Sequence, residues 1–211
     1  MNDLKLDRLS ALLEGLAPEV TLYHSTESRL ESDGLAADRS SLLLYLVTSG
    51  AVQLETMGET SRIESPALLT LRADQSHVLK AMSAADSCQL ICARIRLTGP
   101  VAPLFLEEFA QARTVVLSKD ESALRLAVSM IESELNEPRC GQPALLNRAG
   151  DILFIGLLRH LVAYPGLHGQ GLFSGLADPR IARALVVMHQ RPSFAWDLER
   201  LAQEAGMSRT A

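Results

Sequence analysis

The sequence has no apolar run long enough to cross a membrane. A membrane-spanning helix needs about 20 consecutive apolar residues, and no stretch of the 211 residues approaches that length. The N-terminus, Met1 to Lys5, also lacks the basic start and the apolar stretch of a secretory signal peptide. We therefore expect a cytoplasmic protein that has no membrane partner.

Cysteine is scarce. The three cysteines, Cys88, Cys92 and Cys140, form no CxxC pair, and no His-rich cluster accompanies them. Thiols stay reduced in the cytosol, and a structural zinc site needs closely spaced ligands. We expect free thiols, no metal site and no cofactor.

An excess of positive charge is also absent, because the net charge is -5. A self-sufficient nucleic-acid binder usually carries a basic face, so this chain is not expected to hold DNA by charge alone. A regulator whose basic module is missing stays possible. Catalytic motifs are lacking too: there is no G-x-S-x-G, and the carboxylate pair Glu107-Glu108 falls in a predicted surface helix. We do not expect an enzyme.

Short β-strands are predicted between residues 20 and 95, after a short helix over Leu4–Leu16. The apolar run Leu42–Val47 is followed by the turn residues Ser49-Gly50 and by an alternating run, Ala51–Thr56. Further strands are predicted at Val20–His24, Ala67–Leu71 and Cys88–Leu97. Many short strands separated by turns indicate an antiparallel sandwich or barrel.

The pattern then changes to that of two helices, Ser122–Leu135 and Leu145–Tyr164. The centre of the second helix is apolar on nearly every side, and such a helix must be covered on every side. We expect a homodimer in which Ile152, Ile155 and Leu158 lie in the interface.

Glycines at 166, 169, 171 and 175 predict a flexible linker over residues 166–177. Asp178 as N-cap and Pro179 at the first helical position then start a new helix. A further helix, Leu198–Ala205, is followed by a turn at Gly206 and by Ser208 as the N-cap of another helix. Helix, glycine turn and capped helix are the skeleton of a helix-turn-helix.

The amino-acid sequence of this segment resembles the beginning of the AraC/XylS DNA-binding domain. The matching positions are Asp178 to Ile181, Ala184-Leu185, Met188-His189, Pro192, Trp196 to Glu199, Leu201-Ala202 and Ala205 to Arg209. The resemblance implies that the recognition helix begins at Ser208, and that Ser208 and Arg209 contact phosphates and base edges. Since the family has two helix-turn-helix units, we expect this chain to end within the first, and DNA to be a partner of the full-length protein only.

The preceding residues resemble the cupin sensor domain of such regulators. The resemblance rests on LLLYLVTSGAVQLE at 42–55, on 66–77, on the strand Cys92–Arg96 and on the helix Cys140–Leu161. It implies an α+β chain. Residues 1–165 would form an antiparallel β cupin-like barrel with a helical hairpin, 166–177 the linker, and 178–211 an incomplete all-α helix-turn-helix domain.

Three polar side chains are candidates for an effector pocket. His24 and Tyr45 lie in predicted strands that can face the barrel interior. His77 matches a position that holds a metal ligand in some cupins, but the earlier strands offer no partner histidine. His77 is therefore expected to line a small-molecule pocket or simply to bond to backbone, and Tyr45 either lines the pocket or anchors the sheet.

The cysteines are candidates for oxidant sensing. Cys88 and Cys92 lie on one strand face about 13 Å apart, which is too far for a disulfide. Cys140 follows Arg139, whose charge can lower a thiol pKa; the alternative is three idle thiols. The sequence thus predicts a transcription regulator whose cupin-like domain senses a small molecule or an oxidant. The alternative is a metal-dependent cupin enzyme with a helical extension.

Overall fold

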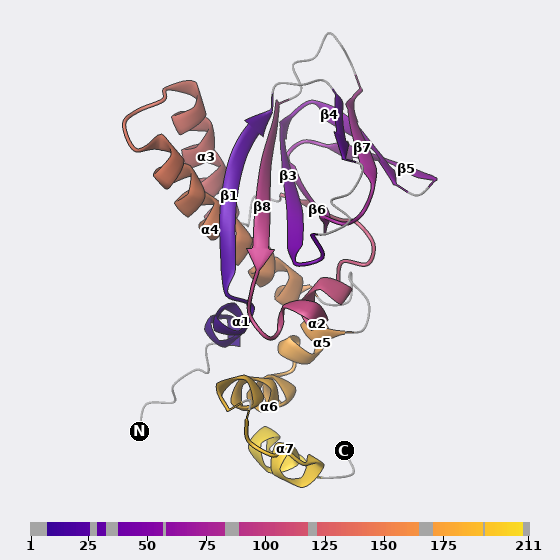
Figure 1. Ribbon diagram of the computed structural model, residues 1–211, viewed down its shortest axis with the longest axis vertical. Coiled ribbons are helices and arrows are strands. Elements are labelled where there is room, and N and C mark those ends of the chain that lie inside the picture. Colours follow the sequence, from indigo (N-terminus) through magenta and orange to yellow (C-terminus); the bar gives the residue numbers. More distant parts are fainter. Residues whose placement is uncertain are drawn as a thin grey trace.

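The computed structural model describes residues 8–25, 29–32, 38–56, 58–82, 89–117, 122–164, 171–191 and 193–208. Figure 1 shows a β-sandwich flanked on one side by a helical hairpin, with small helices gathered at one end and leading to the C-terminus. In the described part of the chain, no helix is long and apolar enough to cross a membrane.

Two antiparallel sheets form the sandwich, as the strand pattern predicted. The first has the strand order β1 (Pro18–Ser25), β8 (Gln89–Leu97), β3 (Ser41–Ser49), β6 (Ala67–Arg72) and β9 (Arg113–Val116). The second has the order β2 (Arg29–Ser32), β7 (His77–Ala81), β4 (Ala51–Thr56) and β5 (Glu59–Glu64). β3 lies at the centre of the first sheet because it pairs with both β6 and β8.

The unbroken apolar run of β3 is explained by burial on both of its faces. Successive strand side chains point to opposite faces of a sheet. Leu42, Leu44 and Leu46 therefore join an outer core beneath the helices, while Tyr45 and its inward-facing neighbours join an inner core between the two sheets.

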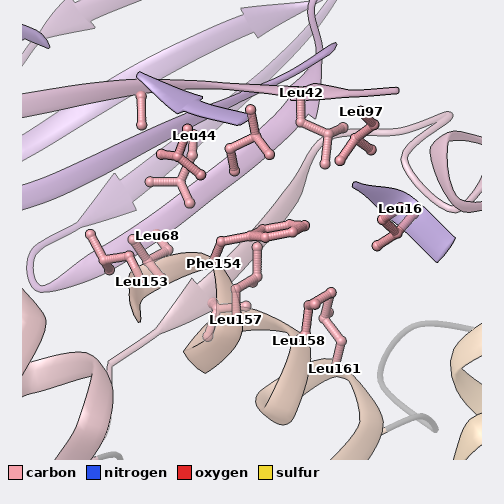
Figure 2. Packing of buried hydrophobic residues seen from close by; sticks show 14 of the residues in the cluster. Leu16, Leu42, Leu44, Leu68, Leu97, Leu153, Phe154, Leu157, Leu158 and Leu161 are labelled. Atoms are coloured by element: carbon pink, nitrogen blue, oxygen red, sulfur yellow. The ribbon is translucent and has the colours of Figure 1, made fainter. Parts of the chain in front are cut away.

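The outer core is covered by the hairpin of α3 (Ser122–Asn136) and α4 (Gln142–Ala163), and by α2 (Ala102–Glu107). Figure 2 shows one face of α4 turned toward the sheet, where Phe154 lies opposite leucines of β3 and β8. Both hairpin helices agree with the prediction to within a few residues. α1 (Arg8–Leu16) agrees over its described residues, since the predicted start at Leu4 lies outside them.

The covering of α4 corrects one predicted dimer contact. Leu158 is completely buried within its own chain, so the prediction that it lies in a subunit interface is wrong. The sheet, α3 and α5 (Leu172–Ala177) already cover that side of the helix. Ile152 is 38% exposed and Ile155 is half-buried, so these two remain open to a partner.

The second half of the predicted flexible linker is helical in the structure, because residues 172–177 form α5. Leu172, Phe173 and Leu176 are buried in the outer core. The ring of Phe173 lies edge-on to that of Phe105, with centroids 5.7 Å apart. A flexible linker is therefore wrong over this stretch, whereas residues 166–170 lie outside the described residues.

The last two helices are α6 (Pro179–Gln190) and α7 (Leu198–Ala205), as predicted. Asp178 caps α6 by accepting a hydrogen bond from the Arg180 backbone N–H at 2.8 Å. α6 packs against α1 and α5, with Ala182 and Val186 buried and Leu185 against the outer core. The C-terminal helices are thus joined to the sandwich by side-chain packing as well as by the chain.

Candidate functional site

The α7 segment has the geometry of the first half of a helix-turn-helix. Asp197 caps α7 by accepting from the Arg200 N–H at 2.8 Å. Gly206 ends the helix with a φ of 66°, a left-handed conformation that favours glycine. The N–H of Met207 then bonds back to the Ala202 carbonyl at 2.8 Å. The chain is thereby turned out of α7, just before the exposed Ser208.

The predicted DNA contacts lie at the end of this turn. Ser208 is exposed, as a residue that meets a ligand must be, but its role stays a prediction. Arg209 lies outside the described residues.

A cation–π cluster holds the connection between α6 and α7. The guanidinium of Arg191 lies 5.1 Å from the centroid of the Trp196 ring, and that of Arg200 lies 5.1 Å from the centroid of Phe194. The Trp196 indole N–H donates to the Arg191 carbonyl at 3.1 Å. This cluster was not predicted from the sequence, although two arginines that flank two aromatic residues within ten positions were a usable signal.

Tyr45 and His77 form a buried pair between the two sheets. Tyr45 Oη lies 2.7 Å from His77 Nε2, and His77 Nδ1 lies 2.9 Å from the Gln75 carbonyl oxygen. That carbonyl can only accept, so Nδ1 carries the proton and Nε2 accepts from the tyrosine. His77 is 2% exposed, and its burial lowers its pKa below the ordinary value.

This pair sits in the closely packed inner core, whose other members are apolar or Cys92. The predicted backbone bond of His77 is present, and the hydroxyl of Tyr45 is used within the protein. Their role as effector contacts stays a prediction. The side chain of His24, the third candidate, lies outside the described residues.

A polar groove opens where the edge strand of one sheet approaches the edge strand of the other. It has a volume of about 520 Å³ and lies between β5, β9 and the turn before β7. Its lining is Leu54, Thr56, Glu59, Thr60, Ser61, Gln75, Ser76, Ala110, Gln111, Ala112 and Thr114. None of these residues was predicted as a site residue, although Gln75 and Ser76 directly precede the predicted His77. Hydroxyls scattered over separate segments form no sequence motif.

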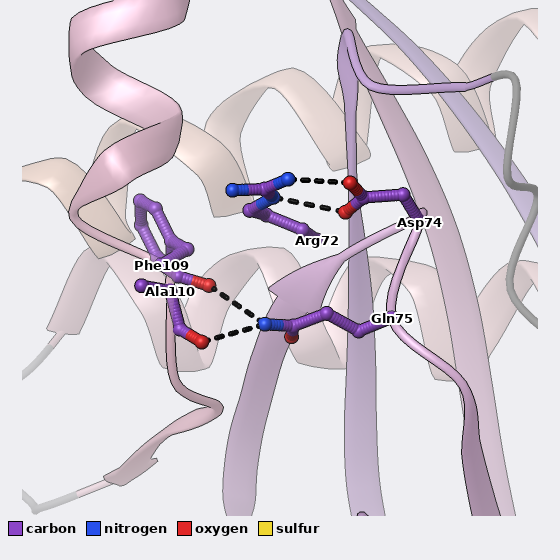
Figure 3. Close-up of polar contacts among 5 residues, drawn as sticks. All are labelled: Arg72, Asp74, Gln75, Phe109 and Ala110. Atoms are coloured by element: carbon purple, nitrogen blue, oxygen red, sulfur yellow. Dashed lines mark hydrogen bonds and ion pairs between the residues drawn. The ribbon is translucent and has the colours of Figure 1, made fainter. Parts of the chain in front are cut away.

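The wall of this groove is fastened by Gln75, as Figure 3 shows. Its side-chain amide donates to the Ala110 carbonyl at 2.6 Å and to that of Phe109 at 3.5 Å. Beside it, Arg72 Nε donates to Asp74 at 2.9 Å, and this hydrogen bond holds the pKa of the Asp74 carboxyl below its usual value. The turn between β6 and β7 is therefore tied to the segment that follows α2.

The same segment is tied to α5 through Glu108. One carboxylate oxygen of Glu108 accepts from the Leu172 N–H at 2.5 Å, and the other lies 3.4 Å from the Arg113 guanidinium. Arg113 Nε also donates to the Glu108 carbonyl at 2.6 Å. The carboxylate thus caps the first turn of α5, and we call these three residues the α5 latch.

The cysteine candidates lie in different environments. Cys92 is buried in the inner core, and burial raises the pKa of its thiol to about 12. Cys140 is exposed, while the guanidinium of the neighbouring Arg139 binds Glu134 at 3.0 Å. Cys88 lies outside the described residues.

Metal ligands do not gather anywhere in the described part of the chain: no group of three His, Cys, Asp or Glu side chains is placed to hold an ion.

Comparison with known proteins places this architecture in a family. A family model described as cupin matches residues 7–163. The RCS-specific HTH-type transcriptional activator RclR of Escherichia coli K12 is 27% identical over 214 residues, covering 98% of this chain and 74% of RclR. A putative AraC-like transcription regulator of Streptomyces antibioticus is 32% identical over 89 residues, which are 42% of this chain and 29% of that protein.

Among solved structures, ToxT from Vibrio cholerae superposes with a TM-score of 0.43 at 12% identity, covering 91% of this chain and 71% of ToxT. The sequence relatives are transcription regulators and not enzymes, which favours the predicted regulator over the cupin-enzyme alternative. The chain therefore belongs to the cupin family, in the branch carried by AraC-type transcription regulators.

Proposed function

We propose that this chain is the signal-receiving part of a DNA-binding regulator, and that residues 178–208 begin its DNA-binding unit. The observation that carries the proposal is the packing of α6 against the cupin core through α1 and α5. A signal that alters the core therefore acts on the first helix of the DNA-binding unit directly. The name of the relative RclR, an HTH-type activator, supports the same assignment.

The proposed mechanism is a shift between two placements of α6. A signal changes such an equilibrium only if it binds or modifies one placement more favourably than the other. Ala182 and Val186 are buried in the present placement, so displacing α6 exposes apolar surface and carries a cost. The signal must supply at least that difference in free energy.

Transcript sequencing tests the proposal in the organism that encodes the protein. A strain lacking the gene is compared with strains that carry the wild type, Ser208→Asp or Glu199→Gln. Asp at position 208 places negative charge where the recognition helix would meet phosphates. Glu199 is exposed at the opposite end of α7 and serves as the matched control.

We expect a discrete set of transcripts to change on deletion, and to be restored by the wild type and Glu199→Gln but not by Ser208→Asp. An unchanged set of transcripts on deletion would contradict the proposed function. Full restoration by Ser208→Asp would contradict the role of that residue.

We also propose a homodimer that uses the exposed side of α4. Ile152 and Ile155 are apolar residues left at least partly open there, and two copies would bring two DNA-reading units together. Sedimentation velocity at micromolar concentration should give a dimer for the wild type and a monomer for Ile152→Arg. A monomeric wild type would end this proposal.

An oxidant is a second candidate signal, because Cys140 is exposed and immediately precedes Gly141, the N-cap of α4. A thiol must be accessible to react with a dissolved oxidant. In the transcript assay, Cys140→Ser should lose the response to an added oxidant. A full oxidant response in that variant would exclude the role of this cysteine.

A further inference from the structure

The end of α1 is held by the short connection that leads from β8 to α2. The last carbonyls of a helix have no partner within that helix. Here the last two carbonyls of α1 and the one that follows them accept hydrogen bonds from the connection. The donors are the Val101 N–H to Gly15 at 3.0 Å, the Gly99 N–H to Leu16 at 2.9 Å and the Thr98 hydroxyl to Ala17 at 3.1 Å. We call Thr98, Gly99 and Val101 the α1 clamp.

The sheet register and a glycine bring the α1 clamp close to the helix. β1 pairs with β8 so that Pro18 lies opposite Leu97, and the residues just before β1 and just after β8 are therefore neighbours. A Cβ added at Gly99 would lie 2.7 Å from the carbonyl carbon of Leu16, which is closer than non-bonded atoms approach. Any larger residue at position 99 would push the connection away from α1.

Ala17 carries backbone strain at the point where α1 ends. Its φ is 45°, a left-handed conformation that a residue with a Cβ adopts only at a cost. Its N–H donates to the Leu13 carbonyl at 2.9 Å, as in a left-handed helix ending, and its carbonyl is the one that accepts from Thr98. The α1 clamp thus stabilises an ending that alanine by itself disfavours.

The same connection also fastens α5. Val101 precedes α2, and its carbonyl accepts from the Phe105 N–H at 3.0 Å. The ring of Phe105 in turn lies edge-on to that of Phe173 in α5. Since α6 packs against both α1 and α5, one connection fastens two supports of α6.

We propose that the α1 clamp couples the cupin core to the DNA-binding unit, and that opening the clamp releases α6. β8 runs directly into the clamp and carries Leu90 and Cys92 in the inner core, so a change in that core reaches the clamp along one continuous strand. The inference deepens the proposed function, on which it rests only for the meaning of this release as a signal.

Hydrogen exchange followed by mass spectrometry, on the purified 211-residue chain, tests the inference through the amides of residues 180–190. Gly99→Ala should accelerate their exchange at least about tenfold, because the added Cβ pushes the clamp away from α1. Thr98→Val should accelerate it roughly fivefold, since one hydrogen bond is lost. Ala17→Gly should slow it at least about twofold, because glycine adopts the left-handed conformation without the cost of a Cβ.

Ile63→Val is the matched control, because Ile63 is buried in the inner core but belongs to the other sheet. It should lower the global stability measured by urea titration and leave the exchange of α6 within twofold of the wild type. Circular dichroism verifies that each variant is folded, and if Gly99→Ala is not, the opposite shifts in Thr98→Val and Ala17→Gly decide.

Unchanged exchange of α6 in Thr98→Val and Ala17→Gly overturns the inference. So does an acceleration in Ile63→Val as large as that in the clamp variants, because α6 would then be released only by global unfolding. The proposed function fails separately, in the transcript assay, so the two failures are distinguishable.

Discussion

His77 gives the native state a pH dependence at the scale of a single residue. Burial lowers its pKa in the folded protein below the ordinary 6.5, so below that pH the unfolded chain binds a proton that the folded chain does not. Stability therefore falls as pH is lowered from 6.5, by at most about 1.4 kcal/mol per pH unit. The free energy of unfolding, measured by urea titration at several pH values from 5 to 7, should have a steeper slope against pH in the wild type than in His77→Gln. Equal slopes would contradict this account of the buried imidazole.

The two described cysteines should differ strongly in reactivity. The thiolate is the form that reacts, and the pKa of Cys92 is raised to about 12 by burial, whereas Cys140 is exposed. Brief treatment with iodoacetamide at pH 7.5 and peptide mapping should find Cys140 modified well before Cys92. In 8 M urea the two rates should become similar. Faster modification of Cys92 in the native protein would show that the inner core opens readily.

The sequence predicted Tyr45 and His77 as separate candidate residues, but it did not predict that they form a buried pair. A histidine just after a turn was expected to bond to backbone, and His77 does so. Its partner Tyr45 comes from the other sheet, and a contact between sheets depends on how they stack. That stacking is a tertiary property with no local signal.

At the scale of elements, Gly150 sets how closely α4 approaches β1. A Cβ added at Gly150 would lie 2.6 Å from Val20 Cγ1, far closer than van der Waals contact allows. Gly150→Ala should therefore destabilise the fold, with an overpacking cost of about 1–3 kcal/mol that is partly offset by roughly 1 kcal/mol of helix propensity. Arg159→Ala, on the exposed side of the same helix, should change the free energy of unfolding by less than about 0.5 kcal/mol. Urea titration compares the two, and a stabilised Gly150→Ala would contradict the packing.

The α5 latch makes a second prediction at this scale. Glu108→Ala removes the carboxylate that accepts from the Leu172 N–H. A hydrogen bond to a charged group contributes about 1.5–3 kcal/mol, so hydrogen exchange at the Leu172 amide should accelerate at least about tenfold. Glu107→Ala, at the exposed neighbouring residue, should leave that exchange rate unchanged. An unaltered rate in Glu108→Ala would show that α5 is held by its apolar side chains alone.

α5 also marks where element prediction from sequence failed. Four glycines in ten residues predicted a flexible linker, and they outweighed Leu172, Phe173 and Leu176. Those three side chains fit a single turn of helix, and what stabilises that turn is the pocket that α2 and α4 provide. The long helices were predicted well because their apolar periodicity extends over many turns.

At the scale of the whole molecule, the resemblance to AraC-type regulators predicted a cupin domain followed by helix-turn-helix residues. The comparisons confirm an AraC-type regulator with a cupin domain, while the bounds of the helix-turn-helix segment stay a prediction. The docking of α6 on α1 was not predicted. These helices are separated by more than 160 residues in the chain, and no pattern within either one names its partner. In the proposed function, this docking is the contact through which a signal in the cupin core reaches α6.

We propose above all that residues 178–208 begin a DNA-binding unit and that the cupin core controls this unit. Chromatin immunoprecipitation with sequencing, on the protein as its own cell makes it, tests this claim most directly. We predict enrichment at a discrete set of promoters for the wild type, and its loss in Gly206→Val, because a β-branched residue does not tolerate the φ of 66° that the turn requires. Uniform background for the wild type, or undiminished enrichment in a folded Gly206→Val protein, would contradict it.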